Sequence, residues 1–273
     1  MVGLGHVVGD DLNGQEIRFS PMDRFDRQIR FDGWGEAAQR RMTAATVLVC
    51  GCGALGSMVA TLLVRAGIGR IRLVDRDTVE TPNLHRQILF TQADADAEER
   101  KVIAAARELR RAGSPTRVEI FDETIDEKSI DRLCDGVTLI VDALDNDLAR
   151  LVVNAAAVRH RLPWVHGAVL GMTGQLAVFR PGRTLCLRCL LNPSDVSAPR
   201  VAEAGVLAPI VTTVASLQAA EAMKLAGGVP ETAILCELVS INLWNGRWCR
   251  IPLGPPDPLC PVCCNVRAGG YNE

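Results

Sequence analysis

A glycine-rich turn between an apolar strand and a helix constrains the fold of this chain more than any other feature. The turn, Gly51-Cys-Gly-Ala-Leu-Gly56, follows the apolar run Val47-Leu-Val-Cys50, and Asp75 ends the next apolar run. In such a fingerprint the glycines let the backbone approach a phosphate, the helix N-terminus attracts it, and the acidic residue binds ribose hydroxyls. The pattern predicts a βαβ unit that binds a nucleotide. Its candidate binding residues are Gly51, Gly53, Ala54, Gly56 and Asp75.

Amide and cationic side chains follow this acidic residue along the chain. The segment Asn83-Leu-His-Arg-Gln87 contains Arg86, and Lys101 comes shortly after it. Hydride transfer needs no such cluster, whereas an enzyme that cleaves ATP must neutralise charge on the phosphates. Taken singly, Arg86 or Lys101 could be a solvated surface cation. Together with the glycine-rich turn, the cluster indicates chemistry at the phosphates of a nucleotide.

The composition suits a globular chain and argues against nucleic-acid and membrane partners. The chain has 273 residues, 48% of them hydrophobic, which is enough for one large domain or a domain with a small appendage. Its 30 basic and 32 acidic residues are mixed, so we expect no one-sided basic surface for nucleic acid. Residues 44–64 are uncharged, but their glycines and β-branched start favour a strand, a turn and a buried helix over a membrane span. The N-terminus lacks a signal-peptide pattern, so we expect a cytoplasmic location.

Two cysteine pairs in the C-terminal part have the spacing of metal ligands. They are Cys186-Leu-Arg-Cys189 and Cys260-Pro-Val-Cys263. Four thiolates form a tetrahedral Zn²⁺ site, and such a site is structural because it leaves no open coordination position. Two unrelated buried or redox-active pairs are the alternative. Cys264 is a neighbouring thiol that could replace one ligand.

Strands and helices alternate along the first half of the chain. Strands are expected at 46–50, 70–75, 116–121 and 137–142, and helices at 54–66, about 97–112, about 127–134 and 146–160. Such alternation implies right-handed βαβ crossovers and a mostly parallel, Rossmann-like α/β sheet with helices on both faces. The strand ends at Gly51, Asp75 and Asp142 to Asp145 should meet at one rim, where such folds bind ligands.

The pattern changes after Pro163. Strands are expected at 164–169 and 174–179, a helix at 206–226, and strands at 233–242 and 246–251 that form an antiparallel C-terminal extension. We expect residues 1–21 to be a loose N-terminal extension and residues 22–273 to form a single domain. Its nucleotide-binding half would be 22–162, and its second half, with the zinc site, would be 163–273.

From Arg24 to Cys263 the chain resembles the ubiquitin-activating-enzyme-like adenylyltransferases of sulfur-carrier proteins, the MoeB/ThiF (HesA) family. The resemblance rests on segments that occur in the order of the family. They are Arg24-Phe-Asp-Arg-Gln-Ile29, the Gly51 turn, Leu73-Val-Asp-Arg-Asp-Thr-Val79, Asn83-Leu-His-Arg-Gln-Ile-Leu-Phe90, Lys101, Asp142-Ala-Leu-Asp-Asn146, Gly174-Gln175, the two cysteine pairs, and Glu203-Ala-Gly-Val206.

The resemblance implies a reaction and its partners. Members of the family bind ATP and Mg²⁺, and the C-terminal Gly-Gly carboxylate of a small ubiquitin-like protein attacks the α-phosphate. The products are an acyl-adenylate and pyrophosphate. The second half of the domain, 163–273, would then be the half that binds the carrier.

The resemblance also implies roles for particular residues. Arg86 and Lys101 would neutralise phosphate charge, and Asp145 would position Mg²⁺. Arg27 would reach the γ-phosphate bound to the other subunit of a homodimer. Asp145 and Asn146 could instead only cap the helix that follows them. The nucleotide-binding residues that the motifs imply, besides those of the glycine-rich turn, are Asp75, Asp77, Asn83, Gln87 and Asn146.

Two positions depart from the family pattern, and one of them, Val201, bears on the chemistry; the other is His85, where relatives often have Gln. Many relatives carry a cysteine that forms a thioester or acyl-disulfide in the loop before Glu203, and here Val201 aligns with it. We therefore expect the enzyme to stop at the acyl-adenylate and pass it to a separate sulfur or amine donor. The alternatives are adenylation of a peptide or small carboxylate, an NAD-dependent oxidoreductase on the same scaffold, and a zinc-bound scaffold without catalysis.

Overall fold

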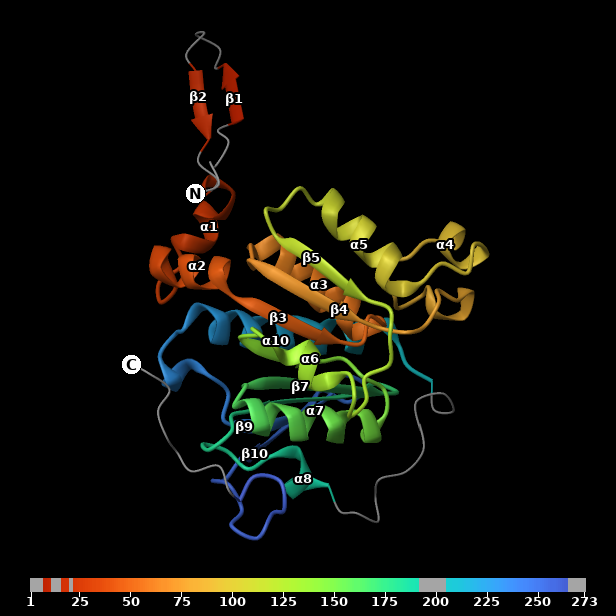
Figure 1. The fold of residues 1–273 in the computed structure, drawn as a ribbon, viewed down its shortest axis with the longest axis vertical. Helices are drawn as coiled ribbons and strands as arrows, with labels where there is room; N and C mark the ends of the chain where they lie inside the picture. The colour runs from red at the N-terminus through yellow and green to blue at the C-terminus, as the bar shows by residue number, and fades with distance from the viewer. Residues whose placement is uncertain (1–6, 11–15, 20–21, 192–204, 265–273) are drawn as a thin grey trace.

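The computed structural model describes residues 7–10, 16–19, 22–191 and 205–264. Eight strands form one sheet: β3 (Thr46–Cys50), β4 (Arg70–Val74), β5 (Arg117–Phe121), β6 (Leu139–Asp142), β7 (Trp164–Leu170), β8 (Thr173–Phe179), β9 (Glu237–Asn242) and β10 (Arg247–Pro252). They lie in the order β10-β9-β8-β7-β6-β3-β4-β5 (Figure 1). Strands β3 to β7 pair in parallel, and the pairs from β7 to β10 are antiparallel. The predicted α/β class, with its parallel first half and antiparallel C-terminal strands, is confirmed.

Helices cover both faces of the sheet because its central strands are apolar on both sides. Val47 and Val49 of β3 share a core cluster with residues of α3 (Ala54–Ala66), α5 (Lys101–Arg111) and α10 (Ala208–Gly227). Leu48 and Cys50, on the other face, share a second cluster with α6 (Ile130–Cys134) and α7 (Asp147–His160). All five residues of β3 are buried, as expected for a central parallel strand.

An N-terminal helical segment, formed by η1 (Asp23–Phe25), α1 (Asp26–Ile29) and α2 (Gly35–Ala44), lies across the C-terminal ends of three core helices. Arg24 donates to two carbonyls after α5, Gln39 donates to the last carbonyl of α3, and Arg41 donates to the last carbonyl of α10. These donors satisfy carbonyls that lack a partner within the helix, and the cations suit the negative end of the helix dipole. Helices α3 and α5 run back from the carboxyl ends of the parallel strands. The segment that contacts their last turns therefore lies at the amino ends of these strands.

Several boundaries differ from the expected ones for local reasons. The helix expected at about 97–112 starts four residues later, and a separate short helix, α4 (Gln92–Asp96), precedes it, started by a capping box of Thr91 and Asp94. Glu98 then has a φ of 49°, and α5 begins only at Lys101. The expected strand at 233–242 begins with a 3-10 turn, η4 (Glu231–Ala233), before β9. Two further short helices of the described chain are η2 (Thr81–Asn83) and α8 (Leu187–Leu190).

The N-terminal region contains a separate pair of strands. Strands β1 (Val7–Asp10) and β2 (Glu16–Phe19) pair in antiparallel fashion within the stretch that we expected to be a loose extension (Figure 1). Throughout the described residues, no helix combines the length and the apolar composition that crossing a lipid bilayer requires.

Candidate functional site

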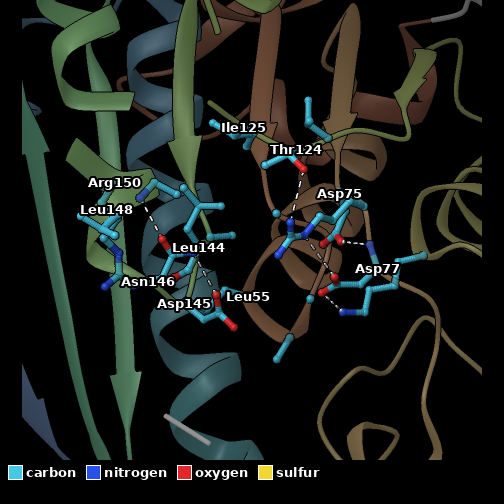
Figure 2. A pocket seen from close by; sticks show the side chains of 18 of the residues that line it. Leu55, Asp75, Asp77, Thr124, Ile125, Leu144, Asp145, Asn146, Leu148 and Arg150 are labelled. Atoms are coloured by element: carbon cyan, nitrogen blue, oxygen red, sulfur yellow. Dashed lines mark hydrogen bonds and ion pairs between the residues drawn. The ribbon is translucent and has the colours of Figure 1, made fainter. Parts of the chain in front are cut away.

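A cavity of about 720 Å³ lies at the carboxyl ends of β3, β4, β5 and β6. Its volume is within the range of pockets that bind small ligands. The predicted site residues that line it are Gly51, Gly53, Ala54, Asp75, Asp77, Arg86, Gln87, Lys101, Asp145 and Asn146. Figure 2 shows Asp75 and Asp77 on one side of the cavity and Asp145 and Asn146 on the other. Of the predicted catalytic and nucleotide-binding residues, Gly56, Asn83 and Arg27 do not line the cavity.

The glycine-rich turn requires glycine at two positions for steric reasons. Gly51 has a φ of 95°, and a Cβ there would lie 2.8 Å from the carbonyl oxygen of Ala143. A Cβ on Gly56 would lie 1.9 Å from the carbonyl oxygen of Gly51. Gly56 therefore lets α3 approach the turn closely, although it lies beneath the cavity rather than at its surface. The free N–H groups of the first turn of α3 are then available to an anion.

Asp75 is held by the backbone of the turn. Its carboxylate accepts hydrogen bonds from the amide nitrogens of Cys52 at 2.7 Å and Asp77 at 2.8 Å. Burial raises the pKa of Asp75, while the positive charge of Lys101 opposes part of that effect. The carboxylate is therefore fixed in position at the end of β4, where it can accept further hydrogen bonds from ligand hydroxyls.

Lys101 provides a buried cation at the start of α5. Only 6% of the residue is exposed, and its Nζ lies 2.9 Å from Oδ2 of Asp77. The backbone N–H of Lys101 also donates to the carbonyl oxygen of Asp77 at 2.9 Å. An ammonium group has three N–H donors, so the contact with Asp77 leaves donors for a phosphate.

Arg86 is oriented by Asn83. Nη2 of Arg86 donates to Oδ1 of Asn83 at 2.7 Å, and Nδ2 of Asn83 donates to Glu80 at 2.9 Å. The structure thus places Asn83 behind Arg86 rather than at the cavity wall. Gln87 is 4% exposed, and its Oε1 has no hydrogen-bond partner among the described residues. A buried amide oxygen without a partner costs free energy, so this atom is suited to a ligand donor.

Asp145 and Asn146 differ in how much of their side chains the fold uses. Oδ1 of Asn146 accepts a hydrogen bond from the amide of Ala149 at 2.8 Å and so caps α7. This capping accounts for one of the roles that the sequence left open. The Asp145 carboxylate is exposed at the cavity, and the side-chain Nδ2 of Asn146 lies 3.5 Å from its Oδ1. It is therefore free to contact a cation.

A buried polar network beneath the cavity was not predicted. Asp142 is fully buried. Its carboxylate accepts hydrogen bonds from Nδ1 of His166 at 2.7 Å and from the backbone amide of Leu144 at 2.9 Å. Its Oδ2 also lies 3.3 Å from Nε of Arg150. Arg150 also donates to the carbonyl oxygen of Leu144 at 2.5 Å and to Asp147 at 3.0 Å. This network fixes the turn that carries Asp145. Of this network, the sequence analysis singled out only Asp142, as a strand end at the rim.

Other residues that line the cavity were not among the predicted site residues. The loop after β5 contributes Glu123 to Glu127, and Thr124 lies 3.5 Å from Nη1 of Arg76 (Figure 2). Apolar side chains form the rest of the wall, on α7 and near β7 and α10. They include Leu144, Leu148, Val152, Val169, Val206 and Val211. Such a surface suits a flat apolar group beside the charged end of the cavity.

Arg27 does not approach the cavity of its own chain. It lies exposed on α1, near the amino ends of the parallel strands, whereas the cavity lies at their carboxyl ends. Its neighbours Phe25 and Gln28 face the core: the Phe25 ring packs on Gly67, and Gln28 donates to the carbonyl oxygen of Ala66. The Arg27 side chain forms no hydrogen bond or ion pair with any residue that the structure describes.

The four predicted metal ligands form one cluster. The Sγ atoms of Cys186, Cys189, Cys260 and Cys263 all lie within 4.8 Å of one another. Separations of 3.8 Å (Cys186–Cys189), 3.8 Å (Cys186–Cys260) and 3.5 Å (Cys189–Cys263) are close to the ~3.8 Å expected for thiolates bound tetrahedrally at about 2.3 Å. The cluster can therefore hold a metal ion, and Cys264 is not part of it. Val201 and Glu203 lie outside the described residues.

We expect the substitution Arg150→Ala to destabilise the protein by about 3–5 kcal/mol, because it leaves the buried Asp142 carboxylate without its cation. Arg159→Ala on the same helix is the matched control. Its ion pair with Asp131 is exposed and should contribute less than about 1 kcal/mol. Urea unfolding followed by circular dichroism measures both variants. Equal free energies of unfolding for the two variants would contradict this account of the network.

Sequence and structure comparisons place the chain in one family. Residues 25–262 match the ThiF family. The chain is 36% identical over 250 residues to a sulfur carrier protein adenylyltransferase of Thermus thermophilus. The aligned region covers 89% of this chain and 90% of that protein. It is 36% identical over 243 residues to the sulfur carrier protein ThiS adenylyltransferase of Bacillus subtilis, covering 88% and 71% of the two chains. A crystal structure of E. coli MccB with AMPCPP and MccA matches with a TM-score of 0.78 at 25% identity, over 90% of this chain and 75% of that one. The chain therefore belongs to the ThiF family.

Proposed function

We propose that this chain is an ATP-dependent adenylyltransferase. It activates the C-terminal Gly-Gly carboxylate of a small ubiquitin-like sulfur-carrier protein as an acyl-adenylate and releases pyrophosphate. The observation that carries the proposal is the arrangement of Lys101, Arg86 and Asp145 around one cavity beside the glycine-rich turn. The names of the T. thermophilus and B. subtilis relatives support the same reaction.

The site residues have distinct tasks in this reaction. A carboxylate oxygen of the carrier forms a bond to the α-phosphorus of ATP, and pyrophosphate leaves with the electron pair of the broken P–O bond. Negative charge grows on the α-phosphate and the leaving group, where Lys101 and Arg86 stabilise it. Asp75 accepts hydrogen bonds from the ribose. Asp145 would hold Mg²⁺, which prefers carboxylate oxygens and supplies further neutralisation of phosphate charge.

The remaining predicted residues support these groups. Asn83 orients Arg86, Asp77 holds Lys101, and Asn146 caps the helix that follows Asp145. The unpartnered oxygen of Gln87 is placed to accept a hydrogen bond from the nucleotide. Since Val201 replaces the loop cysteine of many relatives, the acyl-adenylate passes from this chain to a separate sulfur or amine donor. The reaction and the free thiols suit the reducing cytoplasm.

Arg27 suggests that the active enzyme is a homodimer. Its exposed position on α1, far from its own cavity, supports a role at the γ-phosphate in the cavity of a second subunit. In a two-fold dimer each chain would supply one Arg27 to its partner. Each active site would then be built from both chains.

ATP–pyrophosphate exchange tests the reaction and the dimer together. The native protein, with Mg²⁺ and a carrier ending in Gly-Gly, should incorporate labelled pyrophosphate into ATP. Lys101→Ala and Arg27→Ala should each lower the rate at least ~10²-fold, because each removes a cation that stabilises transition-state charge. Co-expression of the two variants should restore about a quarter of the native rate, because one cavity of each mixed dimer is then intact.

The controls separate the parts of the proposal. Lys128→Ala, which changes an exposed lysine near but outside the cavity, should leave exchange unchanged. No exchange with any carrier, together with tight NAD binding, would favour an oxidoreductase, and exchange with a peptide alone would favour the peptide alternative. Exchange without recovery on co-expression would contradict the shared site. A thiol-sensitive adduct between enzyme and carrier would contradict the absence of a thioester.

We also propose that the cysteine cluster binds zinc as a structural ion. The closed set of four sulfur atoms and their spacing support this choice. The amide nitrogen of Val262 donates to Sγ of Cys260 at 3.5 Å, and a donor of this kind stabilises a metal-bound sulfur. A zinc ion would tie the segment after β10 to α8, since the two cysteine pairs belong to these separate parts of the chain.

Metal analysis of the purified protein should find one zinc ion per chain. Cys263→Ser should lose this zinc and unfold at a lower temperature, because the metal no longer joins the two segments. Cys264→Ser, which changes the neighbouring thiol outside the cluster, should keep both the zinc and the melting temperature. A native protein without zinc, or equal zinc contents in the two variants, would contradict the proposed site.

A further inference from the structure

Helix α7 connects the cavity to the cysteine cluster. Asn146, Arg150, Asn154 and Val158 follow one another at intervals of four residues, so their side chains lie along one side of the helix. Asn146 caps the helix at the cavity, and Arg150 holds the turn before it. Val158, at the other end, packs in the same cluster as Cys186, Cys260 and Cys263.

Asn154 lies between these two ends and contacts the cysteine segment directly. It is fully buried. Its Nδ2 lies 3.6 Å from Sγ of Cys186, and its Oδ1 accepts a hydrogen bond from the amide of Leu187 at 2.9 Å. Both ends of the amide group are thus bonded to the two consecutive residues that begin the first cysteine pair. Across the described residues, it is the one side chain other than the cysteines that donates to the cluster.

Donors to a metal-bound sulfur have a known physical effect. A thiolate keeps part of its negative charge when it binds a cation, and an N–H group directed at the sulfur stabilises that charge. Partners of this kind also hold the ligand in the orientation that the metal requires. A buried asparagine achieves both effects only if its amide is held in place, and the bond from Leu187 holds it.

We propose that Asn154 is a positioning residue of the metal site, which stabilises the Cys186 thiolate and sets the orientation of the turn that carries it. The inference rests on the proposed zinc site but not on the proposed reaction. One consequence is structural: α7 places the first cysteine pair in a fixed relation to the turn that carries Asp145.

Zinc binding by two neighbouring truncations tests the inference. Asn154→Ala should lower zinc affinity about 10–100-fold, measured by competition with a chromophoric chelator, because the sulfur loses its donor and the turn its anchor. Val153→Ala is the matched control. Val153 is also fully buried on α7, but it belongs to the core cluster of α6, α7 and the sheet and not to the cluster that contains Cys186, Cys260 and Cys263. It should loosen the helix without changing zinc affinity.

Cobalt substitution supplies a second measurement that general loosening of the helix would not change. Loss of a hydrogen bond raises the energy of the sulfur lone pairs, so the sulfur-to-Co²⁺ charge-transfer band of Asn154→Ala should shift to lower energy. The band of Val153→Ala should stay in place. Equal zinc affinities for Asn154→Ala and the native protein, or equal losses in both variants, would overturn the inference. A native protein that binds no zinc would overturn the zinc proposal and this inference with it.

Discussion

The close contact between the Gly51 turn and the turn after β6 determines the geometry of the whole candidate site. Gly51 and Gly56 bring the end of β3, the start of α3 and the backbone of Ala143 within distances that no side chain would allow. The contact therefore sets the separation between the two sides of the cavity. One side carries Asp75 and Lys101, and the other carries Asp145.

Charge placement follows from this arrangement. The fold keeps Lys101 almost fully buried at a helix start and orients Arg86 through Asn83, so both cations are preorganised before any ligand binds. On the other side, Asp142 and Arg150 hold their turn from beneath and leave the Asp145 carboxylate exposed. Preorganised cations and a free carboxylate are the groups that phosphate chemistry with a divalent ion requires, because they stabilise charge without having to reorganise during the reaction.

The sequence predicted the parts of the molecule that depend on local pattern. The strand, turn and helix around Gly51 and the paired cysteines were recognisable because each function places particular residue types at a short, regular spacing. Two kinds of feature were not recognisable. His166 and Arg150 reach Asp142 from different elements, so their contact exists only after the sheet has formed. The start of the helix expected at about 97–112 was placed too early, because a separate helix that begins at the capping box of Thr91 precedes it.

Isotope transfer tests the central claim, that the cavity directs a carboxylate to the α-phosphate, most directly. A carrier with ¹⁸O in its C-terminal carboxylate is incubated with the native protein, ATP, Mg²⁺ and hydroxylamine, which attacks the acyl carbon and expels the nucleotide. The account predicts AMP that carries one ¹⁸O atom, with unlabelled pyrophosphate. Label in inorganic phosphate together with ADP would show attack at the γ-phosphate and would contradict the account.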